Sequence, residues 1–211
     1  MNYNLDKEKI IQIYNEKLQT QRNEDLLSTG NELRRNIRFK TLTEIGDFSG
    51  KKILDLGCGF GDFYKYLIDN KIDCEYTGYD INPTIIQIAK DRHRNVNFEI
   101  KDILVDKFPK FDYIVSTSSF NNKLVNISNY DFIEEILKVA YAHSSEGVAI
   151  DFLVSYVDYK HSYAFYYEPE KILSISKNIT RRVIIRNDYP LFEFCTYLYK
   201  DIEFLYGKKY E

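Results

Sequence analysis

The chain has 211 residues, of which 44% are hydrophobic and 29% are charged, which suits one α/β domain with a buried core. The formal net charge of −3 argues against a nucleic-acid-binding protein, because such proteins usually have a basic surface. The cysteines Cys58, Cys74 and Cys195 are odd in number and widely spread, so neither a disulfide framework nor a zinc site is expected. The N-terminus is charged and amphipathic and no long apolar run occurs, so we expect a cytoplasmic protein that does not contact a membrane.

The first part of the chain predicts two helices. In residues 6–19 and 32–45, apolar side chains recur at helical spacing, and Gly46 follows the second helix as its expected cap. We expect residues 1–49 to form a helical cap or lid over the rest of the chain.

From residue 50 onward, short apolar strands alternate with amphipathic helices. This alternation predicts right-handed βαβ units and a parallel sheet. Near the end, residues 181–186 and 191–200 predict two strands joined by a tight connection, so the sheet should finish with an antiparallel strand. The other strands are expected at residues 52–55, 75–79, 96–100, 111–116 and 147–156, and the helices at residues 60–70, 83–93, 131–143 and 169–178.

The expected fold is therefore α/β. It is a Rossmann-like seven-stranded, mostly parallel sheet with an antiparallel C-terminal strand, helices on both faces and an N-terminal helical cap. Residues 50–211 would form the ligand-binding domain, and the chain as a whole one compact unit.

A glycine-rich turn follows the first strand of this sheet. The sequence from Asp55 reads DLGCGFG, so Gly57, Gly59 and Gly61 are separated by single residues. Bare backbone of this kind lets a ligand approach closely, and the next helix offers free N–H groups to an anion. The dinucleotide pattern G-x-G-x-x-G would instead require glycine at Asp62.

Two carboxylates at this turn disfavour a pyrophosphate ligand. Asp55 and Asp62 would lie near its negative charge, at a cost on the order of 1–4 kcal/mol for each close pair. A ligand with an ammonium, a sulfonium and one carboxylate suits the site better, because Asp55 can hold the cation while the turn amides and the helix end hold the carboxylate. S-adenosylmethionine is such a ligand.

The segment from Asp55 to Gly61 resembles motif I of class I S-adenosylmethionine-dependent methyltransferases, and the resemblance extends over about residues 50–200. Asp80 ends the second strand in YTGYD and resembles the acid that accepts both ribose hydroxyls. Asp102 follows the third strand and resembles the acid that accepts the adenine amino group, with the Ile103 amide meeting the ring. The full set of cofactor contacts that the resemblance implies is Asp55, Gly57, Cys58, Gly59, Gly61, Asp80, Ile81, Asp102, Ile103 and Ser116.

A small bacterial subgroup of the family also has an arginine before a phenylalanine in the second helix. Arg38 and Phe39 resemble this pair, which implies that Arg38 reaches the cofactor carboxylate, although a solvated charge is the alternative interpretation. No cluster of histidine, cysteine and carboxylate has metal-ligand spacing, so we expect no metal.

The sequence says less about the part of the site that would bind the methyl acceptor. The segment after the fourth strand lacks the N/D-P-P-Y/F/W motif of enzymes that methylate a planar nitrogen, which lowers the odds of base methylation. Stretches similar to the bacterial subgroup imply a small polar acceptor, with some members in surface-polysaccharide or related small-metabolite pathways. The substrate contacts expected on this basis are Phe120, Asn121, Tyr156 and Tyr166.

His161 is the candidate general base, because the unperturbed pKa of histidine lies near neutrality. The alternative is a surface histidine in a loop. Asp158 and Tyr159, in the same segment, are candidates for binding acceptor hydroxyls.

The leading hypothesis is thus a methyltransferase that converts S-adenosylmethionine to S-adenosylhomocysteine while methylating a small molecule, as a monomer or homodimer. A non-catalytic cofactor-binding partner or regulatory subunit is the alternative from another class. An NAD-dependent oxidoreductase and an RNA methyltransferase are weaker alternatives, because the glycine spacing and the net charge disfavour them.

Overall fold

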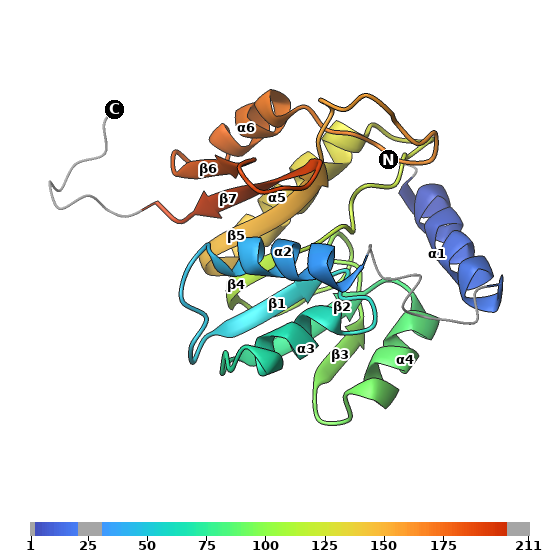
Figure 1. Ribbon diagram of the computed structural model, residues 1–211, viewed down its shortest axis with the longest axis vertical. Helices are drawn as coiled ribbons and strands as arrows, with labels where there is room; N and C mark the ends of the chain where they lie inside the picture. Colours follow the sequence, from blue (N-terminus) through green and yellow to red (C-terminus); the bar gives the residue numbers. More distant parts are fainter. Residues whose placement is uncertain (1–2, 21–30, 202–211) are drawn as a thin grey trace, which may run out of the picture.

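Seven strands form one sheet in the computed structural model, which describes residues 3–20 and 31–201 (Figure 1). The strand order is β3-β2-β1-β4-β5-β7-β6, and β1 to β5 are parallel. Strand β7 runs antiparallel to both β5 and β6, which confirms the expected C-terminal hairpin and the reversed strand. The strands are β1 (Lys52–Leu56), β2 (Glu75–Asp80), β3 (Asn97–Ile100), β4 (Phe111–Ser116), β5 (Ser144–Leu153), β6 (Val183–Arg186) and β7 (Glu193–Tyr199).

Helices cover both faces of the sheet, as predicted (Figure 1). Successive strand residues point to opposite faces, so Ile53 packs under one helix layer and Leu54 under the other. The first layer is α2 (Glu32–Thr43), α3 (Asp62–Asp69) and α4 (Pro83–Arg92), and the second is α5 (Asn129–His143) and α6 (Pro169–Lys177).

Helix α1 (Tyr3–Thr20) packs against the loops at the carboxyl ends of the strands (Figure 1). Asp6 is 2% exposed and accepts hydrogen bonds from the amides of Val125 and Asn126, both at 2.9 Å. At the other end of the helix, the side chain of Asn82 donates to Asn15 at 3.0 Å. These contacts hold α1 across the edge of the sheet where parallel α/β folds bind ligands.

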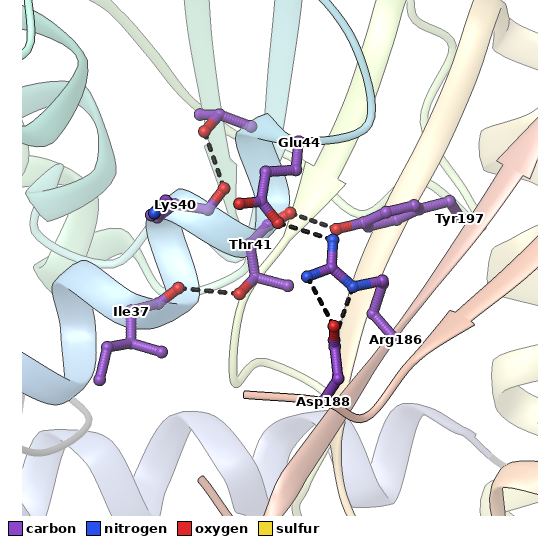
Figure 2. Close-up of polar contacts among 8 residues, drawn as sticks. Ile37, Lys40, Thr41, Glu44, Arg186, Asp188 and Tyr197 are labelled. Atoms are coloured by element: carbon purple, nitrogen blue, oxygen red, sulfur yellow. Dashed lines mark hydrogen bonds and ion pairs between the residues drawn. The ribbon is translucent and has the colours of Figure 1, made fainter. Parts of the chain in front are cut away.

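The C-terminal hairpin is fastened to α2 (Figure 2). The Tyr197 hydroxyl donates to the backbone carbonyl of Thr41, and the Arg186 guanidinium contacts Glu44 at 2.7 Å and Asp188 at 2.7 Å. Helix α2 therefore packs on the sheet beside the hairpin, and β7 is positioned to contact it.

Most element boundaries differ from the sequence prediction by one to three residues, as at α3 and β5. Helix α3 begins at Asp62 and not at residue 60, because Gly61 adopts a left-handed conformation with φ of 83° as its N-cap. Strand β5 begins at Ser144, directly after α5, and ends at Leu153, and the amide of Val154 donates to the carbonyl of Phe192, just before β7. Within the described ranges, no helix is long and apolar enough to cross a membrane.

Candidate active site

A cleft lies at the carboxyl ends of β1 to β4, beneath α1. Its cavity volume is about 190 Å³, and a single water needs only ~10–15 Å³, so the cleft has room for a much larger ligand. The lining comes from α1, α2, the glycine-rich turn, the segments that follow β2, β3 and β4, and α5. The strand order reverses between β1 and β4, and such a switch point is where open α/β sheets bind their ligands.

Only one of the three glycines of the turn faces open space. A Cβ on Gly57 would lie 2.2 Å from Oγ of Ser119, and one on Gly61 would lie 2.7 Å from the His93 ring. At Gly59, which lines the cleft with φ of 55°, no atom lies within 4 Å of the position that a Cβ would take. Gly57 and Gly61 are thus required by packing within the protein, whereas Gly59 leaves bare backbone toward the cleft.

The amides of this turn are already engaged. The N–H groups of Gly57 and Cys58 both donate to the carbonyl of Tyr79, at 2.7 and 3.0 Å. Gly59 donates to Oδ2 of Asp80 at 3.2 Å, and Gly61 donates to the carbonyl of Cys58. These four amides therefore fix the shape of the turn, and the expected contact of the turn amides and helix end with a ligand carboxylate stays a prediction.

Asp55 is a buried carboxylate with one oxygen unsatisfied. Oδ2 accepts a hydrogen bond from the Tyr76 hydroxyl at 2.7 Å, while Oδ1 has no partner among the described residues. Burial raises the pKa of Asp55 to about 7, against the opposing effect of the Tyr76 hydrogen bond. An orphaned oxygen of this kind is costly unless a ligand satisfies it, and a ligand ammonium would do so.

Asp80 and Ile81 line the cleft at the end of β2. The Asp80 oxygens accept from the amides of Gly59 at 3.2 Å and Asn82 at 2.9 Å, which fixes the carboxylate in one orientation. Burial raises the pKa of Asp80, and these amide hydrogen bonds oppose the rise. A carboxylate has about four acceptor positions, so the two amide hydrogen bonds from Gly59 and Asn82 do not use its full acceptor capacity.

Asp102 and Ile103 line the cleft after β3. Oδ1 of Asp102 accepts from the amide of Leu104 at 3.0 Å, and Oδ2 lies 2.8 Å from the ammonium of Lys7, on α1. The sequence did not predict this ion pair, because Lys7 lies 95 residues away along the chain.

Known proteins with similar sequences agree with this arrangement. Residues 47–152 match a family described as a methyltransferase domain. The Mycobacterium tuberculosis protein Rv1506c, whose name describes a methyltransferase, is 30% identical over 150 residues, which are 67% of this chain and 89% of that protein. The chain belongs to the class I S-adenosylmethionine-dependent methyltransferases.

Other relatives share less of their length or sequence. The malonyl-[acyl-carrier protein] O-methyltransferase of Acetivibrio thermocellus is 34% identical over 86 residues, 38% of this chain but only 30% of that enzyme. Among solved structures, magnesium protoporphyrin IX methyltransferase from Synechocystis with bound S-adenosylhomocysteine has a TM-score of 0.61 at 12% identity, covering 82% of this chain and 89% of that one. The similarity to the Synechocystis structure shows that the two proteins share a fold.

The methyltransferase cleft fits its family's cofactor, S-adenosylmethionine. Asp55 offers an unsatisfied buried oxygen, Gly59 offers open backbone, and Asp80 has spare acceptor positions toward the same cavity. The described residues contain no cluster of three or more histidine, cysteine or acidic side chains that could hold a metal.

Cys58 and Ser116, both assigned to the cofactor, lie partly or wholly behind the cleft. Cys58 lines the cavity, but it is buried, and its sulfur would lie 2.8 Å from a Cβ at Gly78, so it fills space between β1 and β2. Ser116 is fully buried and donates to the carbonyl of Leu56 at 2.6 Å, away from the cavity lining.

Arg38 does not reach the cleft. It is 8% exposed and makes two contacts with Glu193 of β7, from Nε at 2.6 Å and from Nη2 at 2.5 Å. The expected contact with the cofactor carboxylate is therefore corrected, because the side chain is held in a buried ion pair behind α2. Arg35, one turn earlier, lines the cleft in its place.

On the acceptor side, the segment after β4 lines the cavity with Thr117, Ser118, Ser119 and Phe120. Asn121, expected beside Phe120, lies outside the lining, because its side-chain oxygen accepts from the amide of Leu153 at 3.0 Å.

The candidate residues of the loop after β5 lie on the surface and none lines the cavity. His161 packs against Tyr159 and Tyr163, and its amide donates to the Tyr166 hydroxyl at 3.2 Å. Tyr156 is 64% exposed and donates to Glu170 of α6 at 2.6 Å. Asp158 is likewise exposed. Tyr159 and Tyr163 of this loop therefore pack on His161, whereas Phe165 and Tyr167 pack against Tyr130 of α5.

Sequence reasoning missed the contribution of α1 to the lining. Tyr3, Ile10, Ile11 and Tyr14 all face the cavity, and Tyr3 stacks on Phe132 of α5 with ring centroids 4.7 Å apart. The available signal was the apolar face of this helix, which predicted a cap without naming which side chains enter the site.

Proposed function

We propose that the protein methylates a small polar acceptor with S-adenosylmethionine. The observation that carries the proposal is the convergence of Asp55, Asp80 and Asp102 from three neighbouring strand ends on one cavity. Three carboxylates suit a ligand with cationic, hydroxyl and amino groups, and they disfavour a polyphosphate.

Each acid has its own role in this proposal. Asp55 binds the ligand ammonium through Oδ1, Asp80 accepts the ribose hydroxyls, and Asp102 accepts the adenine amino group beside Ile103. Gly59 permits close approach of the ligand to the backbone, and Arg35 supplies a cation for the carboxylate. When bound, S-adenosylmethionine provides a methyl group activated by the sulfonium charge.

Helix α1 acts as the lid in this proposal. It lies over the cleft and supplies apolar side chains to it, so it would exclude water from the transfer site. The acceptor would enter beside Thr117, Ser118 and Phe120, which line the part of the cavity after β4.

The relatives do not identify the methyl acceptor of this protein. The enzyme whose printed name specifies malonyl-[acyl-carrier protein] is spanned over only 30% of its length, so its acceptor does not carry over. The surface-polysaccharide or small-metabolite pathway, the monomeric or homodimeric state and the cytoplasmic location remain predictions from the sequence.

Titration calorimetry with S-adenosylhomocysteine tests the cofactor assignment. Asp80→Ala should weaken binding at least tenfold, because charge-assisted hydrogen bonds contribute about 1.5–3 kcal/mol each. Asp73→Ala, at an exposed acid just before β2, is the matched control and should leave the affinity unchanged. Absence of heat with folded wild-type protein would reject the assignment. If the ligand binds, turnover of S-adenosylmethionine with a panel of small hydroxyl and amine acceptors identifies the substrate.

A further inference from the structure

A second buried acid lies behind the acceptor side of the cleft. Asp151 is near the end of β5 and 3% exposed. Its Oδ2 accepts a hydrogen bond from the Thr117 hydroxyl at 2.5 Å, and its Oδ1 accepts from the amide of Ser118 at 2.6 Å. Thr117 and Ser118 both line the cavity, so this carboxylate is connected to the transfer site through one residue.

The segment that joins them is held in an unusual conformation. Ser118 has a positive φ of 56°, which non-glycine residues rarely adopt and which persists only where surrounding contacts impose it. The next hydroxyl, of Ser119, lies within hydrogen-bonding distance of the carbonyls of Leu56, Gly57 and Thr117, to any of which it can donate. Asp151 and these carbonyls fix Thr117 and Ser118 in place at the cavity wall.

The direction of the Thr117 hydrogen bond determines what that hydroxyl can do. Its proton is donated to Asp151, so its remaining lone pairs can only accept a hydrogen bond. A hydroxyl or amine that donates to Thr117 would thus be connected to the buried carboxylate by a chain of two hydrogen bonds.

Charged and titratable groups from several elements surround Asp151. Arg38 of α2 is engaged with Glu193 of β7, while Cys195 of β7 is the strand neighbour of Asp151. Tyr189, in the hairpin connection, has a buried hydroxyl without a hydrogen bond among the described residues. Asp55, across the cleft, adds a further negative charge.

These surroundings raise the pKa of the acid. Burial raises the pKa of Asp151, and Glu193 raises it further, whereas Arg38 and the hydrogen bonds from Thr117 and Ser118 oppose the rise. A carboxyl group whose pKa is raised in this way can be protonated or ionised near neutral pH.

We propose that Thr117 receives the hydrogen bond of a neutral hydroxyl or amine acceptor and that Asp151, behind it, receives the acceptor's proton through the Thr117 hydroxyl. This proposal rests on the proposed function and specifies the acceptor as a protic group. Asp151 is a positioning residue, because it acts through Thr117 and does not touch the cavity.

The step balances without a further reactant. For a hydroxyl acceptor, the carbon–sulfur bond of the sulfonium breaks and its electrons return to sulfur, while the acceptor oxygen forms the new bond to the methyl carbon. The acceptor proton moves to the Thr117 oxygen as the Thr117 proton moves to Asp151. The products are the methyl ether, the neutral thioether and a protonated Asp151.

Sinefungin tests the proposal without knowledge of the acceptor. It is an analogue of S-adenosylhomocysteine in which a carbon bearing an ammonium replaces the sulfur, so it presents a donor where methyl transfer occurs. The measured quantity is the ratio of the dissociation constant of S-adenosylhomocysteine to that of sinefungin. Contacts with the shared amino acid and nucleoside parts, including those of Asp55, cancel in this ratio.

The ratio should depend on Asp151 and Thr117. We expect Thr117→Val and Asp151→Asn to lower it at least tenfold while S-adenosylhomocysteine affinity stays within about threefold. Thr117→Ser keeps the hydroxyl and should preserve the ratio. In the wild-type protein the ratio should rise from pH 5.5 to pH 8 as Asp151 ionises, and Asp151→Asn should abolish that rise.

A purely structural role for Asp151 predicts a different result. Loss of turn support would weaken both ligands together and leave the ratio and its pH dependence unchanged, which would overturn the proposal. If Asp151→Asn does not fold, the ratio of dissociation constants in Thr117→Val tests the proposal. An unchanged ratio in Thr117→Val also overturns the proposal. Failure of wild-type protein to bind either ligand would instead reject the proposed function, and this inference with it.

Discussion

The ammonium of Lys7, on α1, lies 2.8 Å from Oδ2 of Asp102, at the end of β3. The carboxylate is 5% exposed and the lysine 26%, so the pair is only partly screened by solvent. It ties the helix that covers the cleft to the acid that we assign to the adenine amino group. The contact therefore couples the position of α1 to the nucleoside end of the site.

Lys7→Met should accelerate release of S-adenosylhomocysteine. Loss of the pair removes one anchor of α1, and a partly exposed ion pair contributes about 1 kcal/mol, so we expect a roughly fivefold higher dissociation rate. Surface plasmon resonance measures this rate. Lys9→Met, at an exposed position of the same helix, is the control, and equal rates in both variants would show that the ion pair does not hold the lid.

The affinity for S-adenosylhomocysteine should increase with pH through the ionisation of Asp55. Its pKa is raised by burial to about 7, so at lower pH the unliganded protein carries a proton there that must leave before an ammonium can pair with the carboxylate. Linkage predicts about tenfold tighter binding at pH 8 than at pH 6. Asp55→Asn should weaken binding and flatten the profile in calorimetry, whereas an unaltered profile would remove Asp55 as the ammonium partner.

Gly57→Ala and Gly59→Ala should separate stability from binding. Both add strain of about 1 kcal/mol at a positive φ, but only Gly57→Ala also collides with Ser119. We expect the larger loss of unfolding free energy in urea for Gly57→Ala, with partial recovery when Ser119→Gly is added. Gly59→Ala should lose at least tenfold in S-adenosylhomocysteine affinity, and normal binding by this variant would contradict close approach at Gly59.

Arg38→Met should destabilise the fold, while Arg35→Met should weaken ligand binding. Removal of one partner from a buried ion pair typically costs about 3–5 kcal/mol, so Arg38→Met leaves Glu193 without its cation. The added substitution Glu193→Gln should recover part of this loss. Denaturant unfolding and calorimetry on the same variants check the two effects, and a normal unfolding free energy for Arg38→Met would argue against the buried pair.

Much of the cofactor-binding part of the site was predictable, because motifs of neighbouring residues mark it in the sequence. Asp55, Asp80 and Asp102 each end or follow a strand, and the carboxyl ends of parallel strands meet at one edge of a sheet. The glycine spacing then indicated the kind of ligand. The individual reasons for Gly57 and Gly61 were hidden, since Ser119 and His93 approach them from distant parts of the sequence.

The acceptor half was not predictable in the same way. His161 and Tyr159 lie in an aromatic segment that suggested a binding site in the sequence, yet these two side chains pack on each other at the surface and line no part of the cavity. Asp151 lies within a buried apolar strand and carries no motif, and only the folded chain brings it to Thr117.

The sequence alone determined the mostly parallel sheet, the glycine-rich turn after its first strand, and the acids at the strand ends, because strand periodicity and turn chemistry are properties of neighbouring residues. Only the tertiary structure decided that Arg35 and not Arg38 lines the cleft, that Lys7 pairs with Asp102, and that Asp151 supports Thr117. Arg38 and Glu193 are 155 residues apart, and the choice between such partners depends on how helices and strands pack together, which short-range patterns do not encode.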